Sequence, residues 1–398
     1  MIPSEDNSLS SMWLTKLILK SIFMWPDDYS DTKRKTFYKI SMTICLFIQS
    51  GLVLNLTQNY HDWEKNLAVV SSMSTIFQTV FKMTALYQNS DHIKFVLMCM
   101  CRKFWPHNLD NENSEYIFKQ SHSRRMRLMV FLLASGFLFS LGSVISPMFT
   151  RDTPFKSDYP FNWRRSPFYE LIYLIQVAAN GYLINMTVIG FDFLFMDICA
   201  ALTNQYVLLG SCFERLGTEN MQDFYARIRE RGCQKWPPKV GGARRFLGIC
   251  VQHHQLLTQI TKVVGHIFNV VAFLQLCSSV VAICVSGFIA TKDDVTTSQI
   301  ATMGSYLIGH LIQLYIYCSV GNELLFQSST LTNHIFGSNW YNLDSTTTKK
   351  DIIFIMKKAQ IPAKLNAFKV FPLNFATFIA VVRLSFSSYT LLTSITNK

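Results

Sequence analysis

Charged residues are scarce in this sequence. Asp, Glu, Lys and Arg together make up 16% of its 398 residues, whereas hydrophobic residues make up 49%. Soluble globular domains usually carry about 25% charged residues, so this shortage argues against an ordinary soluble protein. A disordered chain is excluded as well, because 32 Phe, 16 Tyr and 7 Trp are too many aromatic side chains to leave in water.

Cysteine is sparse, and the common catalytic motifs are absent. The ten Cys lie mostly in apolar runs without regular spacing, which excludes a secreted disulfide scaffold. The sequence contains no Walker-type glycine loop, no His-Glu-x-x-His and no paired Cys-x-x-Cys. We therefore expect neither an enzyme nor a protein that holds a cofactor or a metal. The composition instead predicts an all-α protein that crosses a membrane several times.

Long apolar runs are abundant. A transmembrane helix needs about 20 apolar residues to cross a hydrocarbon core of roughly 30 Å. Several runs meet that length with at most one or two ionisable residues; one of them, Lys82, is expected to reach the membrane interface along its flexible stem. We predict seven transmembrane helices, at about residues 40–60, 66–87, 128–150, 168–196, 263–290, 299–322 and 371–395.

The basic residues are distributed unevenly between the connecting segments. Of the 37 Lys and Arg, 28 lie in residues 1–39, 88–127, 197–262 and 324–370. Because cytoplasmic loops hold an excess of Lys and Arg, we predict a cytoplasmic N-terminus and an extracellular C-terminus. The net charge of +12 then reflects topology and anionic inner-leaflet lipid rather than nucleic acid.

The cytoplasmic N-terminal segment, residues 1–39, contains an amphipathic pattern. Apolar Leu9, Met12, Trp13, Leu17 and Phe23 alternate with Lys16 and Lys20. This pattern predicts a helix that lies at the membrane interface. The alternative is a flexible tail with incidental apolar residues.

Uncharged polar and aromatic side chains gather in the extracellular halves of the second, third, fourth and sixth spans. A pocket for a small, mostly apolar ligand combines aromatic walls with a few hydrogen-bonding groups. The alternative is that these polar groups bond to one another between helices, as they often do in membranes. The candidate ligand-binding residues are Ser74, Phe77, Gln78, Phe139, Ser140, Ser143, Tyr173, Gln176, Asn180, Met303, Tyr306 and His310.

One arginine, Arg383, lies near the middle of the last predicted span. Ionisable groups at that depth usually face protein or water. Arg383 therefore favours a last helix that lines an aqueous vestibule, and the alternative is an arginine that snorkels or is paired locally.

The C-terminal third carries an ordered series of motifs. They are Gly321-Asn-Glu-Leu-Leu-Phe-Gln-Ser-Ser329, Asn339-Trp-Tyr341, Ile355-Met-Lys-Lys358 with Gln360 and Pro362, Lys369-Val-Phe-Pro-Leu-Asn374, and Ser385 to Ser394. This series closely resembles the insect odorant receptor family. The seven spans and the cytoplasmic N-terminus agree with that resemblance over the whole chain.

The resemblance implies a channel fold in which residues 324–370 belong to a cytoplasmic tetramerisation bundle. It also implies a ligand-gated, non-selective cation channel that assembles as a heterotetramer with an odorant co-receptor and binds volatile odorants. In the family the last helix lines the pore, which implies pore-lining roles for Arg383, Thr390, Leu391, Leu392, Thr393 and Ser394. Because the co-receptor is longer, we expect a ligand-tuning subunit, placed in the plasma membrane of an olfactory sensory neuron dendrite.

Three alternatives compete with this interpretation. A G-protein-coupled receptor would have the opposite orientation, and the sequence lacks Asp-Arg-Tyr and Asn-Pro-x-x-Tyr at the expected spans. A secondary transporter would show paired, Gly- or Pro-interrupted spans in corresponding halves, and none is found. A gustatory receptor of the same fold is the remaining alternative, although its typical Thr-Tyr start and Gln-Phe end are absent from the last helix.

Overall fold

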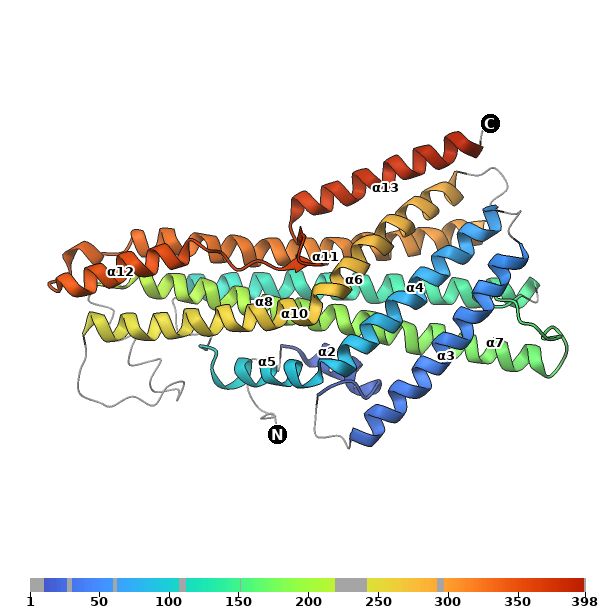
Figure 1. The fold of residues 1–398 in the computed structure, drawn as a ribbon, viewed down its shortest axis with the longest axis horizontal. Coiled ribbons are helices and arrows are strands. Elements are labelled where there is room, and N and C mark those ends of the chain that lie inside the picture. Colours follow the sequence, from blue (N-terminus) through green and yellow to red (C-terminus); the bar gives the residue numbers. More distant parts are fainter. Residues whose placement is uncertain are drawn as a thin grey trace.

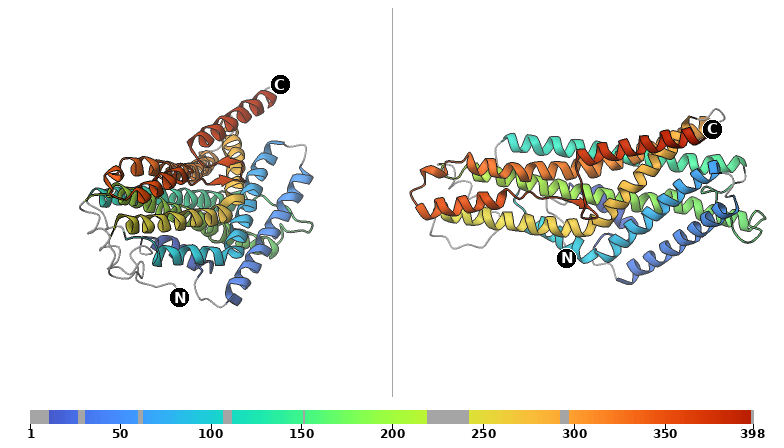
Figure 2. Two further views of the ribbon diagram at one scale, coloured as in Figure 1. Left: turned by 60° about the vertical axis from the view of Figure 1, so that its left-hand side comes forward. Right: turned by 45° about the horizontal axis from the view of Figure 1, so that its top comes forward.

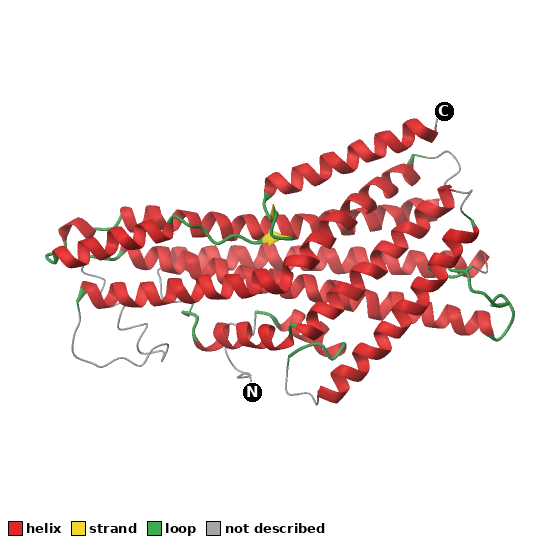
Figure 3. Cartoon of the chain, in the orientation of Figure 1, coloured by secondary structure: helices red, strands yellow, loops and turns green. Residues whose placement is uncertain are grey.

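The computed structural model is an elongated bundle of long helices (Figures 1 and 3). It describes residues 11–26, 31–59, 63–106, 112–150, 152–218, 242–291 and 297–396, so Leu9 of the predicted amphipathic pattern lies outside the described residues. In chain order the elements are α2 (Trp13–Ser21), α3 (Asp31–Gln58), α4 (Trp63–Gln88), α5 (Ser90–Arg102), α6 (Glu112–Thr150), α7 (Phe168–Ala178), η2 (Ala179–Ile184), α8 (Asn185–Glu214), α10 (Ala243–Ala290), α11 (Thr297–Phe336), η3 (Trp340–Asn342), α12 (Thr346–Ala359), β1 (Asn366–Ala367), β2 (Phe371–Pro372) and α13 (Phe375–Thr396).

Five helical stretches within the described residues are long and apolar enough to cross a membrane. They are Asp31–Gln58, Phe118–Ile145, Phe168–Glu214, Ala243–Ala290 and Phe375–Ser394. The remaining two predicted spans fall on α4 and α11, which pack within the same bundle. Where the membrane boundaries lie along these helices stays a prediction.

Large apolar side chains cover the outside of the bundle, as expected for a surface that faces lipid. On α6 and α7, for example, Phe131, Phe137 and Leu174 are exposed, by 61%, 67% and 65%. Soluble monomers rarely expose contiguous apolar surface on this scale. Polar side chains lie inside instead: Lys82 and Asp192 are both completely buried.

Helix α8 occupies the centre of the bundle, between α4, α6, α10 and α11 (Figure 1). It is apolar around most of its circumference, and Phe191, Phe193, Leu194 and Phe195 are all fully buried. A helix that is hydrophobic on all sides is stable only when it is surrounded by other elements. Packing around α8 therefore organises the rest of the fold.

The N-terminal helix α2 packs against α8 with one of its faces. Met12, Ile18 and Leu19 are buried there, whereas Trp13 and Leu17 point outward and are 54% and 60% exposed. Met12, one of the apolar residues of the predicted interfacial helix, therefore belongs to the protein core. The contact of Trp13 and Leu17 with lipid stays a prediction.

A two-stranded hairpin connects α12 to α13. Strands β1 and β2 pair antiparallel, with Asn366 opposite Pro372. The turn residues Phe368 and Lys369 have φ values of 51° and 59°, and the Lys369 N–H donates to Asn269 Oδ1 on α10 at 2.9 Å. The hairpin is thereby fixed to α10. Beyond it, α13 runs along the outside of the bundle (Figure 2).

Candidate ligand-binding site

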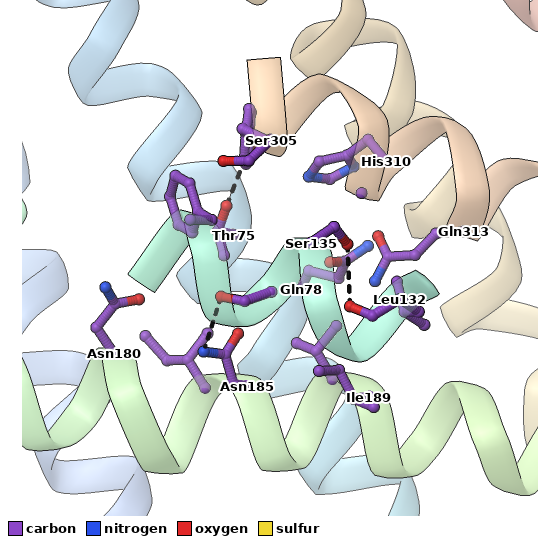
Figure 4. Close-up of a pocket in the computed structure, with 16 residues that line it drawn as sticks. Thr75, Gln78, Leu132, Ser135, Asn180, Asn185, Ile189, Ser305, His310 and Gln313 are labelled. Atoms are coloured by element: carbon purple, nitrogen blue, oxygen red, sulfur yellow. Dashed lines mark hydrogen bonds between the residues drawn. The ribbon is translucent and has the colours of Figure 1, made fainter. Parts of the chain in front are cut away.

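A cavity of about 60 Å³ lies between α4, α6, the η2–α8 segment and α11 (Figure 4). A single water needs about 10–15 Å³ of such space, so the cavity has room for more than one water. Five of the twelve predicted ligand-binding residues line it: Gln78, Phe139, Asn180, Tyr306 and His310. They come from four different helical segments.

Aromatic rings form one wall of the cavity. The Tyr306 ring lies 5.1 Å from the Phe139 ring and meets the His310 ring edge-on at 4.5 Å, measured between centroids. Its hydroxyl donates to the Ser71 carbonyl oxygen and lies 3.2 Å from Thr75 Oγ1. The Tyr306 ring is thus held in place from both ends, so that it presents a rigid apolar face to the cavity.

A π-helical turn shapes the opposite wall. The segment η2, from Ala179 to Ile184, interrupts an otherwise continuous α-helix. In a π-helix residues five apart lie one turn apart, so Asn180 and Asn185 both face α6. Asn180 Nδ2 donates to Ser143 Oγ at 2.5 Å, and Asn185 Nδ2 donates to Ser140 Oγ. Ser140 and Ser143, which were predicted to bind ligand, therefore join α6 to the η2–α8 segment and do not line the cavity.

A buried polar network forms the floor of the cavity. Gln78 and Gln313, both lining residues, extend into it. Gln78 Nε2 donates to Ser278 Oγ at 2.9 Å and also to Gln275 Oε1. Gln313 Nε2 donates to Asp192 Oδ2 at 2.9 Å. Side chains of α4, α8, α10 and α11 thus meet directly beneath the candidate ligand position.

An ion pair lies at the centre of this network. Lys82 Nζ is 2.7 Å from Asp192 Oδ1, and neither side chain is accessible to solvent. Lys82 also donates to Gln275 Oε1 at 3.0 Å, and the Tyr317 hydroxyl donates to Asp192 Oδ1 at 2.8 Å. The expectation that Lys82 reaches the membrane interface is therefore wrong: a fully buried countercharge holds it inside the bundle.

Gln176 lies apart from the cavity and anchors the connection between α6 and α7. Its side chain is fully buried, accepts from the Phe155 N–H at 3.1 Å and donates to Ser157 Oγ at 2.6 Å. It also donates to the Tyr159 hydroxyl, and the Tyr159 ring stacks on Phe47 of α3 at 4.7 Å. Gln176 thus joins the loop to the helices on which it rests.

The remaining predicted ligand-binding residues lie outside the cavity lining. The Tyr173 hydroxyl donates to the Val144 carbonyl oxygen at 2.8 Å. Phe77 is 48% exposed and lies against Phe81 at 4.6 Å. Ser74 and Met303 are half-buried. Each of these four side chains lies on a helix that borders the cavity or continues into it.

The predicted pore-lining residues lie on α13, away from the cavity. Arg383, Thr390, Leu391 and Ser394 are exposed in the single chain, whereas Leu392 and Thr393 are half-buried. The described residues contain no group of three or more His, Cys, Asp or Glu that could hold a metal ion.

Several lining residues were not predicted from the sequence, notably Ser135, Asn185, Ser305 and Gln313. Asn185 and Gln313 lie beyond the stretches that were predicted to form the extracellular halves of their spans. One signal pointed there: Lys82 and Asp192 are both ionisable residues inside predicted spans, and such residues usually pair with one another.

The fold matches solved structures of insect olfactory receptors. The structure of olfactory receptor OR5 from Machilis hrabei in complex with eugenol superposes with a TM-score of 0.81 at 15% identity, covering 98% of this chain and 100% of that chain. The structure of the same receptor described without eugenol gives a TM-score of 0.78, covering 97% and 100%. These matches confirm the predicted insect odorant receptor fold.

Sequence comparisons point the same way. Odorant receptor Or1 of Anopheles gambiae is 25% identical over 404 residues, which cover 96% of this chain and 95% of that protein. Odorant receptor 83a of Drosophila melanogaster is 24% identical over 275 residues, covering 61% and 60%. The family model described as 7tm Odorant receptor matches residues 63–386, most of the chain. The chain is therefore a membrane protein that belongs to the odorant receptor family, a family of receptors rather than of enzymes.

Proposed function

We propose that this odorant receptor is a ligand-tuning subunit that binds a small, largely apolar volatile molecule in the cavity between α4, α6, η2–α8 and α11. The observation that carries the proposal is the lining itself. It combines the aromatic wall of Phe139 and Tyr306 and several aliphatic side chains with uncharged polar groups, and it contains no Asp, Glu, Lys or Arg. Pockets of this composition suit neutral ligands, because a charge would lose its hydration without compensation.

Ligand binding is coupled to an ion pathway in the assembled receptor. Together with an odorant co-receptor the chain forms a heterotetrameric, non-selective cation channel in the plasma membrane of the olfactory neuron dendrite, with a cytoplasmic N-terminus. Arg383 and the stretch from Thr390 to Ser394 line its pore. Binding opens the channel because the ligand has a higher affinity for the open arrangement than for the closed one. The gustatory alternative has lost its support, since the family match is to odorant receptors.

The deciding experiment records whole-cell current from cells that express this chain alone or with an odorant co-receptor. A panel of volatile alcohols, esters, aldehydes and aromatics is applied while G-protein signalling is blocked. We expect a rapid cation current only in the co-expressing cells. Silence towards every volatile, with both subunits at the cell surface, would contradict the proposal, and responses to sugars or bitter compounds would restore the gustatory alternative.

The pocket assignment makes a separate prediction. Tyr306→Ala removes a ring that packs against Phe139 and His310. We therefore expect the potency of the affected agonists to change by about tenfold or more, which alters the rank order of agonists, while the reversal potential stays constant. Ile308→Ala is the matched control, because Ile308 lies on the same helix but is 54% exposed. An unchanged rank order in Tyr306→Ala would contradict the assignment.

A further inference from the structure

Two buried polar atoms that belong to cavity-lining residues lack a hydrogen-bond partner. They are Asn180 Oδ1 and His310 Nδ1, and the two side chains are only 1% and 5% exposed. Figure 4 shows Asn180 and His310 on different sides of the group of lining residues. Because buried polar atoms in folded proteins are nearly always paired, both mark positions at which a ligand can supply the missing partner.

The hydrogen bonds around Asn180 fix which of its atoms is free. The Ser143 hydroxyl donates its hydrogen to the Ser140 carbonyl oxygen at 3.0 Å. Ser143 Oγ is therefore left as an acceptor, and it receives the Asn180 Nδ2 donor at 2.5 Å. Flipping the carboxamide would place two acceptors against each other. The free atom of Asn180 is thus its oxygen, which can only accept a hydrogen bond.

The second free atom, His310 Nδ1, does not select one ligand class. A neutral imidazole nitrogen is either a donor or an acceptor, depending on its tautomer, so it can adapt to several groups. Asn180 Oδ1 cannot adapt. Charged donors are disfavoured, because the lining has no carboxylate to balance an ammonium group. The donor that fits is therefore a neutral one, and among neutral groups the O–H of an alcohol or phenol makes a shorter hydrogen bond to an oxygen than an N–H does.

We propose that this cavity selects small apolar molecules that carry a hydroxyl group, alcohols or phenols, and that Asn180 Oδ1 accepts the ligand's hydroxyl hydrogen. This inference rests on the proposed function, because it assumes that the cavity is the ligand site. The π-helical turn η2 is what makes the recognition possible, since it brings Asn180 onto the α6-facing wall beside Ser143. A methyl ether of the same skeleton has no hydrogen to donate and leaves Oδ1 unpaired.

The test compares matched ligand pairs on the receptor co-expressed with the odorant co-receptor. Each alcohol or phenol in the panel is paired with its own methyl ether, and the concentration for half-maximal current is measured for both. A neutral hydrogen bond contributes about 0.5–1.5 kcal/mol, which corresponds to roughly a two- to tenfold change. We expect the hydroxyl member to be the more potent by about five- to tenfold in the native receptor.

Asn180→Leu removes the acceptor while keeping a similar volume, so the difference between the paired ligands should shrink to about twofold or less. Asn59→Leu is the matched control; Asn59 lies at the end of α3, outside the cavity, and donates to the Asn55 carbonyl oxygen. It should keep the native hydroxyl preference. Ser143→Ala releases the Asn180 amide without removing it and should lower the preference partially.

The outcomes separate this inference from the proposed function. If volatiles open the channel but alcohols and ethers are equally potent in the native receptor, hydroxyl selection is wrong and the ligand site stands. A full preference retained in Asn180→Leu overturns the role of Asn180. If Asn180→Leu does not reach the cell surface, two measurements still test hydroxyl selection. They are the potencies of the paired ligands on the native receptor and on Ser143→Ala. If no volatile evokes current, it is the proposed function that fails.

Discussion

At the scale of single residues, the structure depends most on a buried ion pair. Lys82 and Asp192 lie 2.7 Å apart with no exposed area. Removing one charge from such a pair typically costs about 3–5 kcal/mol, because the other charge stays buried without its partner. We therefore expect Lys82→Met to lower the melting temperature in detergent and to reduce surface expression strongly.

The double variant Lys82→Met with Asp192→Asn provides the control for this prediction. Asparagine keeps one oxygen, which can accept one of the two hydrogen bonds that Gln313 and Tyr317 donate to Asp192 in the native chain. No unpaired charge is left, so most of the lost stability should return. A double variant no more stable than Lys82→Met alone would show that charge pairing is not the cause.

Polarity in the sequence indicated some of the residues that line the cavity, and their role in ligand binding stays a prediction. Gln78, Asn180 and His310 could be found because uncharged polar groups inside apolar spans seek partners or a cavity. Two features were not predicted: which residue pairs with Lys82, and the change of helical register at η2. Lys82 and Asp192 are 110 positions apart, and hydropathy does not pair distant residues. The π-helical turn η2 shifts the helical register, so a regular helix repeat could not place Asn185 on the cavity wall.

At the scale of elements, hydropathy predicted apolar runs but not whole helices. Helix α10 begins at Ala243, well before the predicted span at residue 263. Its early turns bury Leu247, Cys250 and Leu257 between polar residues, a pattern too polar for a transmembrane signal. The extension is stabilised by packing against α8 and other elements (Figure 1), and a single segment of sequence does not reveal such tertiary contacts.

The junction between the hairpin and α13 depends on one glycine. A Cβ atom at Gly321 of α11 would lie 2.4 Å from the Leu373 carbonyl oxygen. Leu373 is 3% exposed, and its N–H donates to the Leu365 carbonyl oxygen at 2.9 Å, so this backbone has little freedom to move. We expect Gly321→Ala to destabilise the chain by about 1–3 kcal/mol through overpacking.

Thermal unfolding in detergent measures this effect, and Gly304→Ala is the control. Gly304 lies on the same helix, and a Cβ atom there would meet nothing within 4 Å. Its replacement should leave the melting temperature unchanged or raise it slightly, because alanine favours helix more than glycine does. Equal melting temperatures for the two variants would show that the close approach at Gly321 is not rigid.

At the scale of the whole molecule, α13 is the least buried of the five helical stretches in the described residues that are apolar enough to cross a membrane. Only 17% of its most apolar stretch is buried, and it lies along the outside of the bundle (Figure 2). Arg383 is exposed on it together with apolar Leu384 and Leu391. An exposed arginine amid apolar residues suits a helix with lipid or protein on one side and water on the other, which supports the proposed tetrameric pore.

The proposed pore predicts distinct effects for two faces of α13. Leu391 and Phe386 are 62% and 65% exposed, but residues five apart on an α-helix point in different directions. Hydrophobic constrictions close pores by excluding water, so Leu391→Ala should raise the current without agonist several-fold in the co-expressed receptor. Phe386→Ala should leave the current without agonist unchanged.

The rank order of agonists should stay the same in both variants, because neither side chain lines the ligand cavity. A Leu391→Ala receptor with altered agonist order and unaltered resting current and ion selectivity would place Leu391 outside the pore.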